Sequence, residues 1–388
     1  MHTPHPIPYW RLSSFYGFYF AALGGLLPFW SLYLENRGFN ALEIGELSAL
    51  LVGTKVIAPN IFGWIADHTG KSLRIIRIAQ FLAALFFLCF LQVTDYKGFA
   101  LVTLVFSFFW NAALPQFEAV TLFHIQTQPL RYAQIRLWGS IGFIAAVLGI
   151  GWLLDYVSIA VLPIAITGLL TLTWISALVT PEAHTSSHKQ SSTGILRIVF
   201  STEVLAFLVV YLLLQIAHSP YYVFFSLYLK QYHYSASMIG FLWALGVFAE
   251  IVLFMLMRRL LERVNLRKIL LVSIALSSLR WFLTARYADS LSIILIAQLC
   301  HAATFASLHV VAMHLIQGYF GKHHQGKGQA LYSSVSFGLG GVLGGYYSGY
   351  FWALLGSEQV FLLAATCCAC ALLIAFIWVG RDQIKSFH

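Results

Sequence analysis

Long apolar segments alternate with short polar stretches along the whole chain. The apolar segments are residues 10–34, 42–66, 73–93, 98–124, 133–155, 158–180, 202–230, 237–261, 267–286, 290–317, 327–353 and 358–380. An apolar run of roughly 18 residues or more is long enough to cross a bilayer core of about 30 Å as a helix. The pattern therefore predicts an all-α membrane protein with twelve transmembrane helices.

Composition supports this prediction and narrows the function. The chain has 388 residues, of which 60% are hydrophobic and only 10% are charged. A soluble globular protein carries about 25% charged residues. A membrane enzyme should carry a clustered catalytic motif at one membrane face, and a sensor should carry a soluble output domain. The sequence contains neither, so transport is the favoured function and we expect no enzyme activity.

The positions of lysine and arginine predict the orientation. If both termini lie inside, the inner side carries seventeen of these residues and the outer side carries four, namely Arg37, Lys97, Lys230 and Arg286. Such an asymmetry is typical of cytoplasmic termini and an even number of spans. It also explains the net charge of +9 without a nucleic-acid partner.

The two halves of the chain resemble each other. "SLYLENRGFNALEIG" (31–45) recurs as "SLYLKQYHYSASMIG" (226–240) at an offset of 195 residues. The polar stretch near the midpoint has the composition of a flexible linker. We therefore predict an N-terminal six-helix bundle (1–180), a cytoplasmic linker (181–201) and a pseudo-symmetric C-terminal bundle (202–388).

Two charged residues lie at equivalent depths of the two predicted bundles. Glu250 is the one charged residue in "GFLWALGVFAEIVLFML" (240–256), and the offset of 195 relates it to Lys55. A single charge at the bilayer centre costs about 2.5–3.5 kcal/mol on insertion scales. Two interpretations follow, either a structural ion pair or side chains that line the transport path.

Other ionisable groups occur inside predicted spans. They are Glu118, Arg280, His301 and His309. His301 and His309 are eight residues apart, which places them within about 80° on one helix face. Buried histidines act as proton relays or simply pack through hydrogen bonds. The spacing of the cysteines in the sequence fits no metal site, so we expect neither a metal site nor another cofactor.

The segment "GWIADHTGKSLR" (63–74) carries Gly63, Asp67, Gly70 and Lys71 at the spacing of a known loop signature. It resembles the cytoplasmic loop of the major facilitator superfamily. The resemblance implies that Asp67 belongs to a cytoplasmic gate, and Arg136 is the candidate counter-charge.

Several sequence segments resemble one branch of that superfamily. "LPFWSLYL" (27–34), "IRLWGSIGF" (135–143), "LRWFLTA" (279–285) and "HAATFASLHVVAMHLI" (301–316) resemble the bacterial 3-phenylpropionic acid transporter group, the phenylpropionate permeases. The resemblance implies a monomer in the bacterial cell inner membrane that takes up an aromatic carboxylate.

The chemistry of the buried groups suits such a carboxylate moving with a proton. Lys55 or Arg280 would hold the carboxylate, and Glu250 or Glu118 would carry the proton of a symport cycle. Alternatives of the same fold are a proton-coupled sugar or nucleoside symporter and a drug or metabolite exporter.

Overall fold

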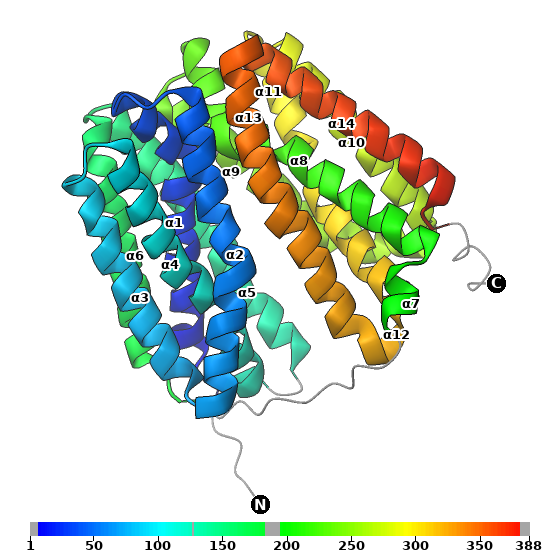
Figure 1. Cartoon of the computed structure of the whole chain (residues 1–388), viewed down its shortest axis with the longest axis horizontal. Helices are drawn as coiled ribbons and strands as arrows, with labels where there is room; N and C mark the ends of the chain where they lie inside the picture. The colour runs from blue at the N-terminus through cyan, green and yellow to red at the C-terminus, as the bar shows by residue number, and fades with distance from the viewer. Residues whose placement is uncertain (1–6, 126–127, 183–194, 381–388) are drawn as a thin grey trace, which may run out of the picture. The chain divides into compact units, whose positions relative to one another are not determined.

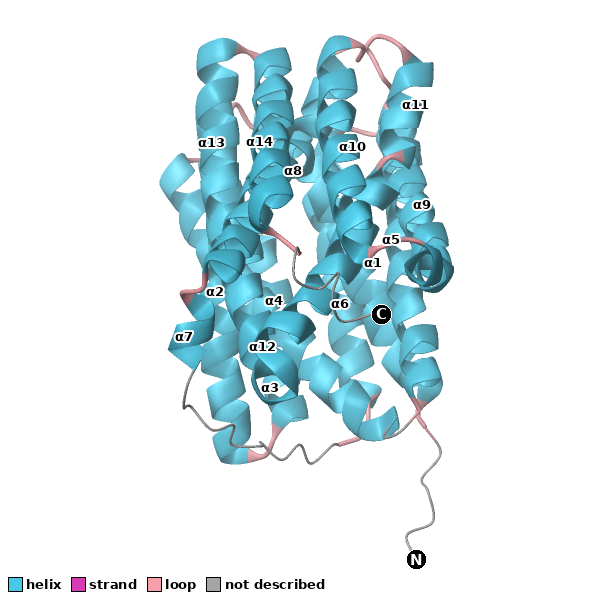
Figure 2. Cartoon of the chain, turned by 90° about the vertical axis from the view of Figure 1, so that its right-hand side faces the viewer, coloured by secondary structure: helices cyan, strands magenta, loops and turns pink. Residues whose placement is uncertain are grey.

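The computed structural model describes residues 7–125, 128–182 and 195–380. Within these ranges every regular element is a helix (Figure 2). The first half contains α1 (Tyr9–Asn36), α2 (Ala41–Thr69), α3 (Ser72–Leu88), η1 (Cys89–Leu91), α4 (Tyr96–Ile125), α5 (Pro129–Leu154), η2 (Ile159–Val161) and α6 (Leu162–Val179).

The second half contains α7 (Ile195–Val199), α8 (Thr202–Gln231), α9 (Ala236–Arg263), α10 (Leu266–Arg286), α11 (Leu291–Leu299), η3 (Ala303–Ser307), α12 (Leu308–Ser333), η4 (Ser334–Gly340), α13 (Gly341–Leu355) and α14 (Ser357–Trp378). η1 and η2 are 3₁₀ turns, whereas η3 and η4 are π-helices. The prediction of an all-α membrane protein is confirmed.

Eleven helices of the described residues are long and apolar enough to cross a membrane. They coincide with eleven of the twelve predicted spans. The remaining predicted span, 327–353, is occupied by the end of α12, by η4 and by α13. Its glycine, serine and tyrosine content lowers its hydropathy below that of the others. Gly321 separates it from the preceding span by a non-helical turn with φ of +61°, a conformation that favours glycine.

Contacts divide the chain into two compact units (Figure 1). The first contains α1 to α6 except for residues 40–49 of α2, which group with α7 to α14 in the second. Most of the predicted linker, residues 183–194, lies outside the described residues. Within the end of the predicted linker, α7 forms a short helix.

The two units repeat one packing pattern. In the first unit, α1 packs against α5 and α6, and α3 packs against α4 and α6. In the second unit, α8 packs against α13 and α14, and α10 packs against α11 and α14. The helices correspond in chain order, so the pseudo-symmetry predicted from the sequence repeat is confirmed within each unit.

The repeat extends to single turns. Gly38, in the turn before α2, has φ of +92°, and His233, at the same place before α9, has φ of +62°. Asn40 and Ser235 then cap the two helices, since the side chain of each accepts a backbone N–H three residues later. These pairs are related by the offset of 195 that the sequence predicted.

The approach of α1 to α5 depends on a glycine. A Cβ atom at Gly142 would lie 2.0 Å from the carbonyl oxygen of Gly17. We expect Gly142→Ala to lower the free energy of unfolding by about 1–3 kcal/mol, because the two backbones must separate. Gly149→Ala on the same helix is the control, since its Cβ would meet no described atom within 4 Å. Equal melting temperatures of the two purified variants would contradict this packing.

Candidate functional site

The second unit buries a fully enclosed arginine. Arg280 lies on α10 with 0% of its surface exposed. Its Nη1 donates to Nδ1 of His301 at 2.9 Å and to Oγ1 of Thr304 at 3.1 Å. Its Nη2 donates to Oε1 of Gln298 at 2.8 Å. Gln298, His301 and Thr304 are three residues apart along the chain. α11, η3 and the residues between them therefore present one polar side chain per turn to the guanidinium.

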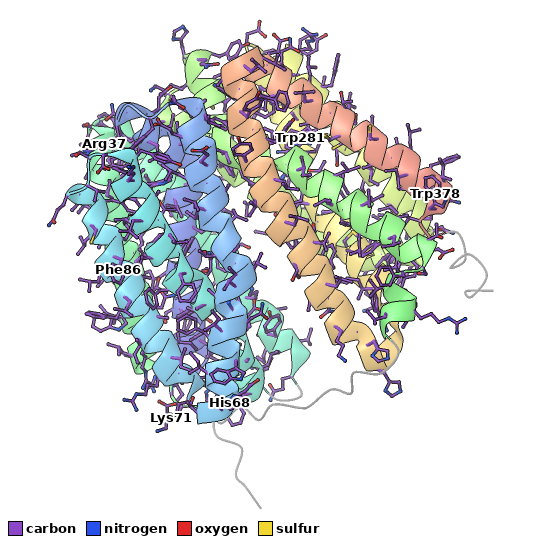
Figure 3. The ribbon with its side chains drawn as sticks, viewed as in Figure 1. Arg37, His68, Lys71, Phe86, Trp281 and Trp378 are labelled. Atoms are coloured by element: carbon purple, nitrogen blue, oxygen red, sulfur yellow. The ribbon has the colours of Figure 1, made fainter. Side chains whose placement is uncertain are left out.

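Two aromatic rings hold the guanidinium as well. Its central carbon lies 4.5 Å from the ring centre of Tyr221 and 4.2 Å from that of Trp281. A cation over an aromatic face is stabilised by about 2 kcal/mol or more when desolvated. Trp281 lies among the helices of the second unit, where it is labelled (Figure 3). Gln298 is fixed in turn, because its Nε2 donates to the carbonyl of Leu242 at 3.0 Å.

The arginine determines which nitrogen of His301 carries a proton. A guanidinium has only N–H donors, so Nδ1 of His301 must accept and Nε2 must carry the hydrogen of the neutral ring. Nε2 lies 3.8 Å from Oε2 of Glu250 on α9. Gly246, one turn before Glu250, permits this approach, since a Cβ there would lie 3.3 Å from the His301 ring.

Glu250 is less enclosed than its neighbours. Its side chain is 19% exposed, compared with 6% for His301. The side chains of Arg280, His301 and Glu250 thus run from a buried permanent cation, through an imidazole, to a partly exposed carboxylate. This arrangement can hold a proton on the carboxylate or release it, and the imidazole can orient toward either form.

The first unit contains a second acid–base pair. Glu118 on α4 lies 3.5 Å from Nε of Arg136 on α5. The Arg136 guanidinium also lies 4.3 Å from the ring centre of Phe20 and 5.2 Å from that of Tyr16, both on α1. Each partner of the ion pair is about one-third exposed. Three helices therefore meet at this pair.

The pair at Glu118 and Arg136 should matter more for transport than for stability. Pairs this exposed contribute about 0–1 kcal/mol, because solvent screens them. We expect Glu118→Gln to change the free energy of unfolding by less than about 1 kcal/mol and to lower transport by about tenfold, since a proton-carrying acid contributes at least that much. Thermal unfolding and uptake of the same preparation check this. A variant that transports normally would remove Glu118 from the candidate proton path.

The predicted gate role of Asp67 and Arg136 stays a prediction. Asp67 is exposed near the end of α2, close to Lys71 and His68, which lie at that end of the helix (Figure 3). Gly70 has φ of +64°, which allows the tight turn that its place in the loop signature predicted. Arg136, expected as the counter-charge of Asp67, has Glu118 as its carboxylate partner. Sequence spacing did not reveal this, because the partner comes from another helix.

Lys55 lies on α2 beside a network of polar side chains. Asn111 on α4 donates to Oγ1 of Thr54 at 2.8 Å, and Thr54 donates to Oγ of Ser107 at 3.0 Å. These bonds fix α2 against α4 at this level. The Lys55 side chain is exposed, whereas Thr54 is buried. Lys55 is therefore less enclosed than Arg280, which is fully buried.

His309 continues the row that begins at His301. The ring of Phe305 lies between them, stacked at 5.8 Å from His301 and 6.5 Å from His309. The predicted common face is thus kept, with the π-helix η3 inserted between the two histidines. Sequence reasoning missed Gln298 and Thr304 as partners of Arg280. Their spacing of three residues on either side of His301 was the signal that would have revealed them.

Among the described residues, no group of three or more His, Cys, Asp or Glu side chains is placed to hold a metal ion.

Solved structures share the fold of this chain. A nucleoside transporter, NupG, matches with a TM-score of 0.87 and 17% identity, over 95% of this chain and 99% of that one. At this identity the likeness shows the fold alone, which is that of the major facilitator transporters.

The chain belongs to the MFS_1 like family, whose model matches residues 9–363. The probable 3-phenylpropionic acid transporter of Escherichia coli K12 is 30% identical over 91% of this chain and 93% of its own length. The maltose permease of Geobacillus stearothermophilus is 27% identical over 95% of this chain and 94% of its own. The protein is a multi-pass membrane transporter and not an enzyme.

Proposed function

We propose that the protein takes up a small aromatic carboxylate together with a proton, by alternating access, across the bacterial inner membrane. The observation that carries the proton coupling is the sequence of side chains Arg280, His301 and Glu250 inside the second unit. A partly exposed carboxylate beside an imidazole is an arrangement that can load and release a proton.

Protonation of Glu250 would lower the free-energy cost of keeping this side chain within a membrane span. A charged carboxylate within a span costs about 2.5–3.5 kcal/mol on insertion scales, and protonation removes that cost. The N–H of His301 can face either form, because Arg280 holds the ring from the other side. In this scheme Arg280 positions His301 and does not bind the substrate.

The substrate carboxylate is then assigned to Lys55. Arg280 was the alternative, but both of its Nη atoms already donate to His301, Thr304 and Gln298. Its Nε has no partner among the described residues, but the whole side chain is fully buried. Lys55 is exposed on a helix of the first unit and carries the compact positive charge that a carboxylate needs. The aromatic part of the substrate is supported by the relative from E. coli, which is named for 3-phenylpropionic acid.

The proposed orientation places both termini in the cytoplasm. It rests on the seventeen basic residues that this arrangement assigns to the inner side, against four outside. The proposed functional form is a monomer, with the lipid bilayer and a small substrate as its partners.

Neutralising Lys55 tests the substrate class. A charge-assisted hydrogen bond contributes about 1.5–3 kcal/mol, so Lys55→Gln should raise the half-saturating concentration of 3-phenylpropionate by roughly 10- to 100-fold. The assay is counterflow of the labelled acid in proteoliposomes, with maltose and a nucleoside as competitors. Lys97→Gln, at an exposed lysine in the first turn of α4, is the control. Competition by maltose or the nucleoside but not by the acid would overturn the proposal in favour of that class.

A further inference from the structure

The connection between α9 and α10 carries a dense group of basic residues. Residues 258–268, named here the basic corner, contain one acidic residue, Glu262. The same segment contains five basic residues, which are Arg258, Arg259, Arg263, Arg267 and Lys268. Only Val264 and Asn265 separate the two helices, so these side chains lie together at one end of the second unit.

Most of this charge has no carboxylate partner. Within the described part of the chain, Glu262 pairs with Arg258, whereas Arg259, Arg263 and Lys268 are exposed and pair with no described carboxylate. The first turn of α10 contains no acidic residue either. Because the N-terminal end of a helix is itself positive, basic side chains there add to an unfavourable positive potential. An anion bound at the basic corner would relieve it.

The equivalent corner of the first unit is less basic. Residues 63–74, between α2 and α3, contain Asp67 and two basic residues, Lys71 and Arg74. Both corners are cytoplasmic in the proposed orientation, and the first one satisfies the positive-inside rule with this smaller charge. The rule therefore does not account for the additional arginines of the basic corner.

The depth of these arginines follows from the same repeat. The offset of 195 relates Arg259 to Trp64 and Arg263 to His68. Trp64 and His68 are exposed, with ring centres 4.3 Å apart at the end of α2. Exposed tryptophan is enriched at the level of the lipid headgroups. Arg259 and Arg263 therefore occupy headgroup-level positions that are aromatic in the first unit.

An apolar face of α10 begins at the basic corner. Its exposed residues after Lys268 are Val272, Ala275, Leu279 and Phe282. Spacings of three and four residues place them on one side of the helix, away from the buried Arg280. The face is about 21 Å long from Lys268 to Phe282, which exceeds the half-thickness of about 15 Å of a bilayer core. A lipid acyl chain fits along it.

α3 has the equivalent apolar face in the first unit. Its exposed residues are Arg74, Ile78, Phe81, Leu85 and Leu88, each related to the series on α10 by an offset of 194. The apolar part is thus common to both units. The difference lies in the charge where each face begins.

We propose that the basic corner binds the phosphate of an anionic phospholipid and that one acyl chain of this lipid lies along the apolar face of α10. Arg259 and Arg263 are four residues apart, so their guanidinium groups lie on one side of α9 and can both contact the phosphate. Lys268 adds a third positive charge. The lipid joins the ends of the helices that carry Glu250 and Arg280. The site does not depend on the proposed substrate or on proton coupling.

The unmodified transporter tests the chemistry of the ligand. Native mass spectrometry of the purified protein measures binding of dioleoylphosphatidylglycerol and, separately, of dioleoylphosphatidylcholine. We expect one phosphatidylglycerol to bind at least about tenfold more tightly, since each basic residue near a lipid surface contributes roughly fivefold. Equal affinities would overturn the proposal. Release of the bound lipid by inorganic phosphate alone would overturn the part played by the acyl chain.

Two double variants test the location. Arg259→Gln with Arg263→Gln should weaken binding of phosphatidylglycerol by roughly 30-fold. The matched control is Lys71→Gln with Arg74→Gln, which removes the same charge from the first unit and should leave the affinity of the tightly bound lipid unchanged. All four side chains are exposed, so we expect both variants to melt at the wild-type temperature.

Equal losses in the two variants would overturn a local site in favour of general attraction to the positive end of the protein. If either variant fails to fold, the comparison of the two lipids on the unmodified transporter still decides the proposal.

Discussion

Replacing Glu250 by glutamine is expected to abolish accumulation driven by a pH gradient while exchange of substrate across the membrane continues. Glutamine has nearly the same shape and keeps an acceptor for Nε2–H of His301, 3.8 Å away. It cannot bind or release a proton, so the cycle is held in the form that corresponds to protonated Glu250. Removal of a positioned proton-transfer group typically costs 10²–10⁴-fold in rate, and we expect a loss in that range.

The measurement compares two assays on one preparation. Gradient-driven uptake reports the complete cycle, whereas counterflow at equal pH reports substrate binding and the conformational change alone. The control is Glu262→Gln, which removes an exposed carboxylate at the end of the same helix. Among the described residues, its ion-pair partner is Arg258, in an exposed i, i+4 bridge. If Glu250→Gln accumulates substrate as well as the wild type does, Glu250 is not the proton carrier.

Replacing Arg280 is expected to have the largest effect on stability. Removal of one partner from a buried polar cluster typically costs about 3–5 kcal/mol, because the remaining groups lose their compensation. Arg280→Ala leaves the acceptors on His301, Thr304 and Gln298 without a donor. It also creates an empty space beside the rings of Tyr221 and Trp281. We expect a strongly lowered melting temperature and loss of transport.

A second variant separates folding from function. Arg280→Lys keeps a positive charge but has one nitrogen in place of the fork, so it cannot reach Gln298 and His301 together. It should fold with a smaller loss of stability and leave His301 poorly fixed, which would lower gradient-driven uptake more than counterflow. Full stability of Arg280→Ala in a melting experiment would contradict the contacts that define this cluster.

The architecture was largely predictable because each element has a strong local signal. A span of about 20 apolar residues forms a helix in lipid wherever it lies, since the backbone has no other way to satisfy its hydrogen bonds. The offset of 195 correctly related the turns at Gly38 and His233, because both sequences need the same tight connection. The chemistry of individual turns, not only their hydrophobicity, is thus repeated between the halves.

The irregular helices were not predictable. Whether a backbone N–H bonds to the fourth or the fifth residue before it depends on neighbouring helices, such as the contact of Tyr211 with Leu308 at the end of η3. The sequence did not predict the partners of charged residues, because these too depend on neighbouring helices. Arg136 pairs with Glu118 across two helices, and the loop signature pointed to Asp67 instead.

The polar residues within spans were predictable from the sequence, but the separate role of each residue was not. Arg280 and Lys55 were equivalent as carboxylate ligands on chemistry alone. Only the packing distinguishes them, since one is enclosed by hydrogen bonds and rings and the other is exposed. Burial therefore decides which charge is available to a ligand, and burial depends on contacts that no single span encodes.

The most direct test of the account is to measure proton movement caused by the substrate. Unlabelled 3-phenylpropionate is added to proteoliposomes in a lightly buffered medium without a pH gradient, and the external pH is followed. We predict alkalinisation beyond that of protein-free liposomes, which corrects for diffusion of the neutral acid, and loss of this excess in Glu250→Gln. Entry of labelled substrate with no excess alkalinisation would contradict proton symport through Glu250.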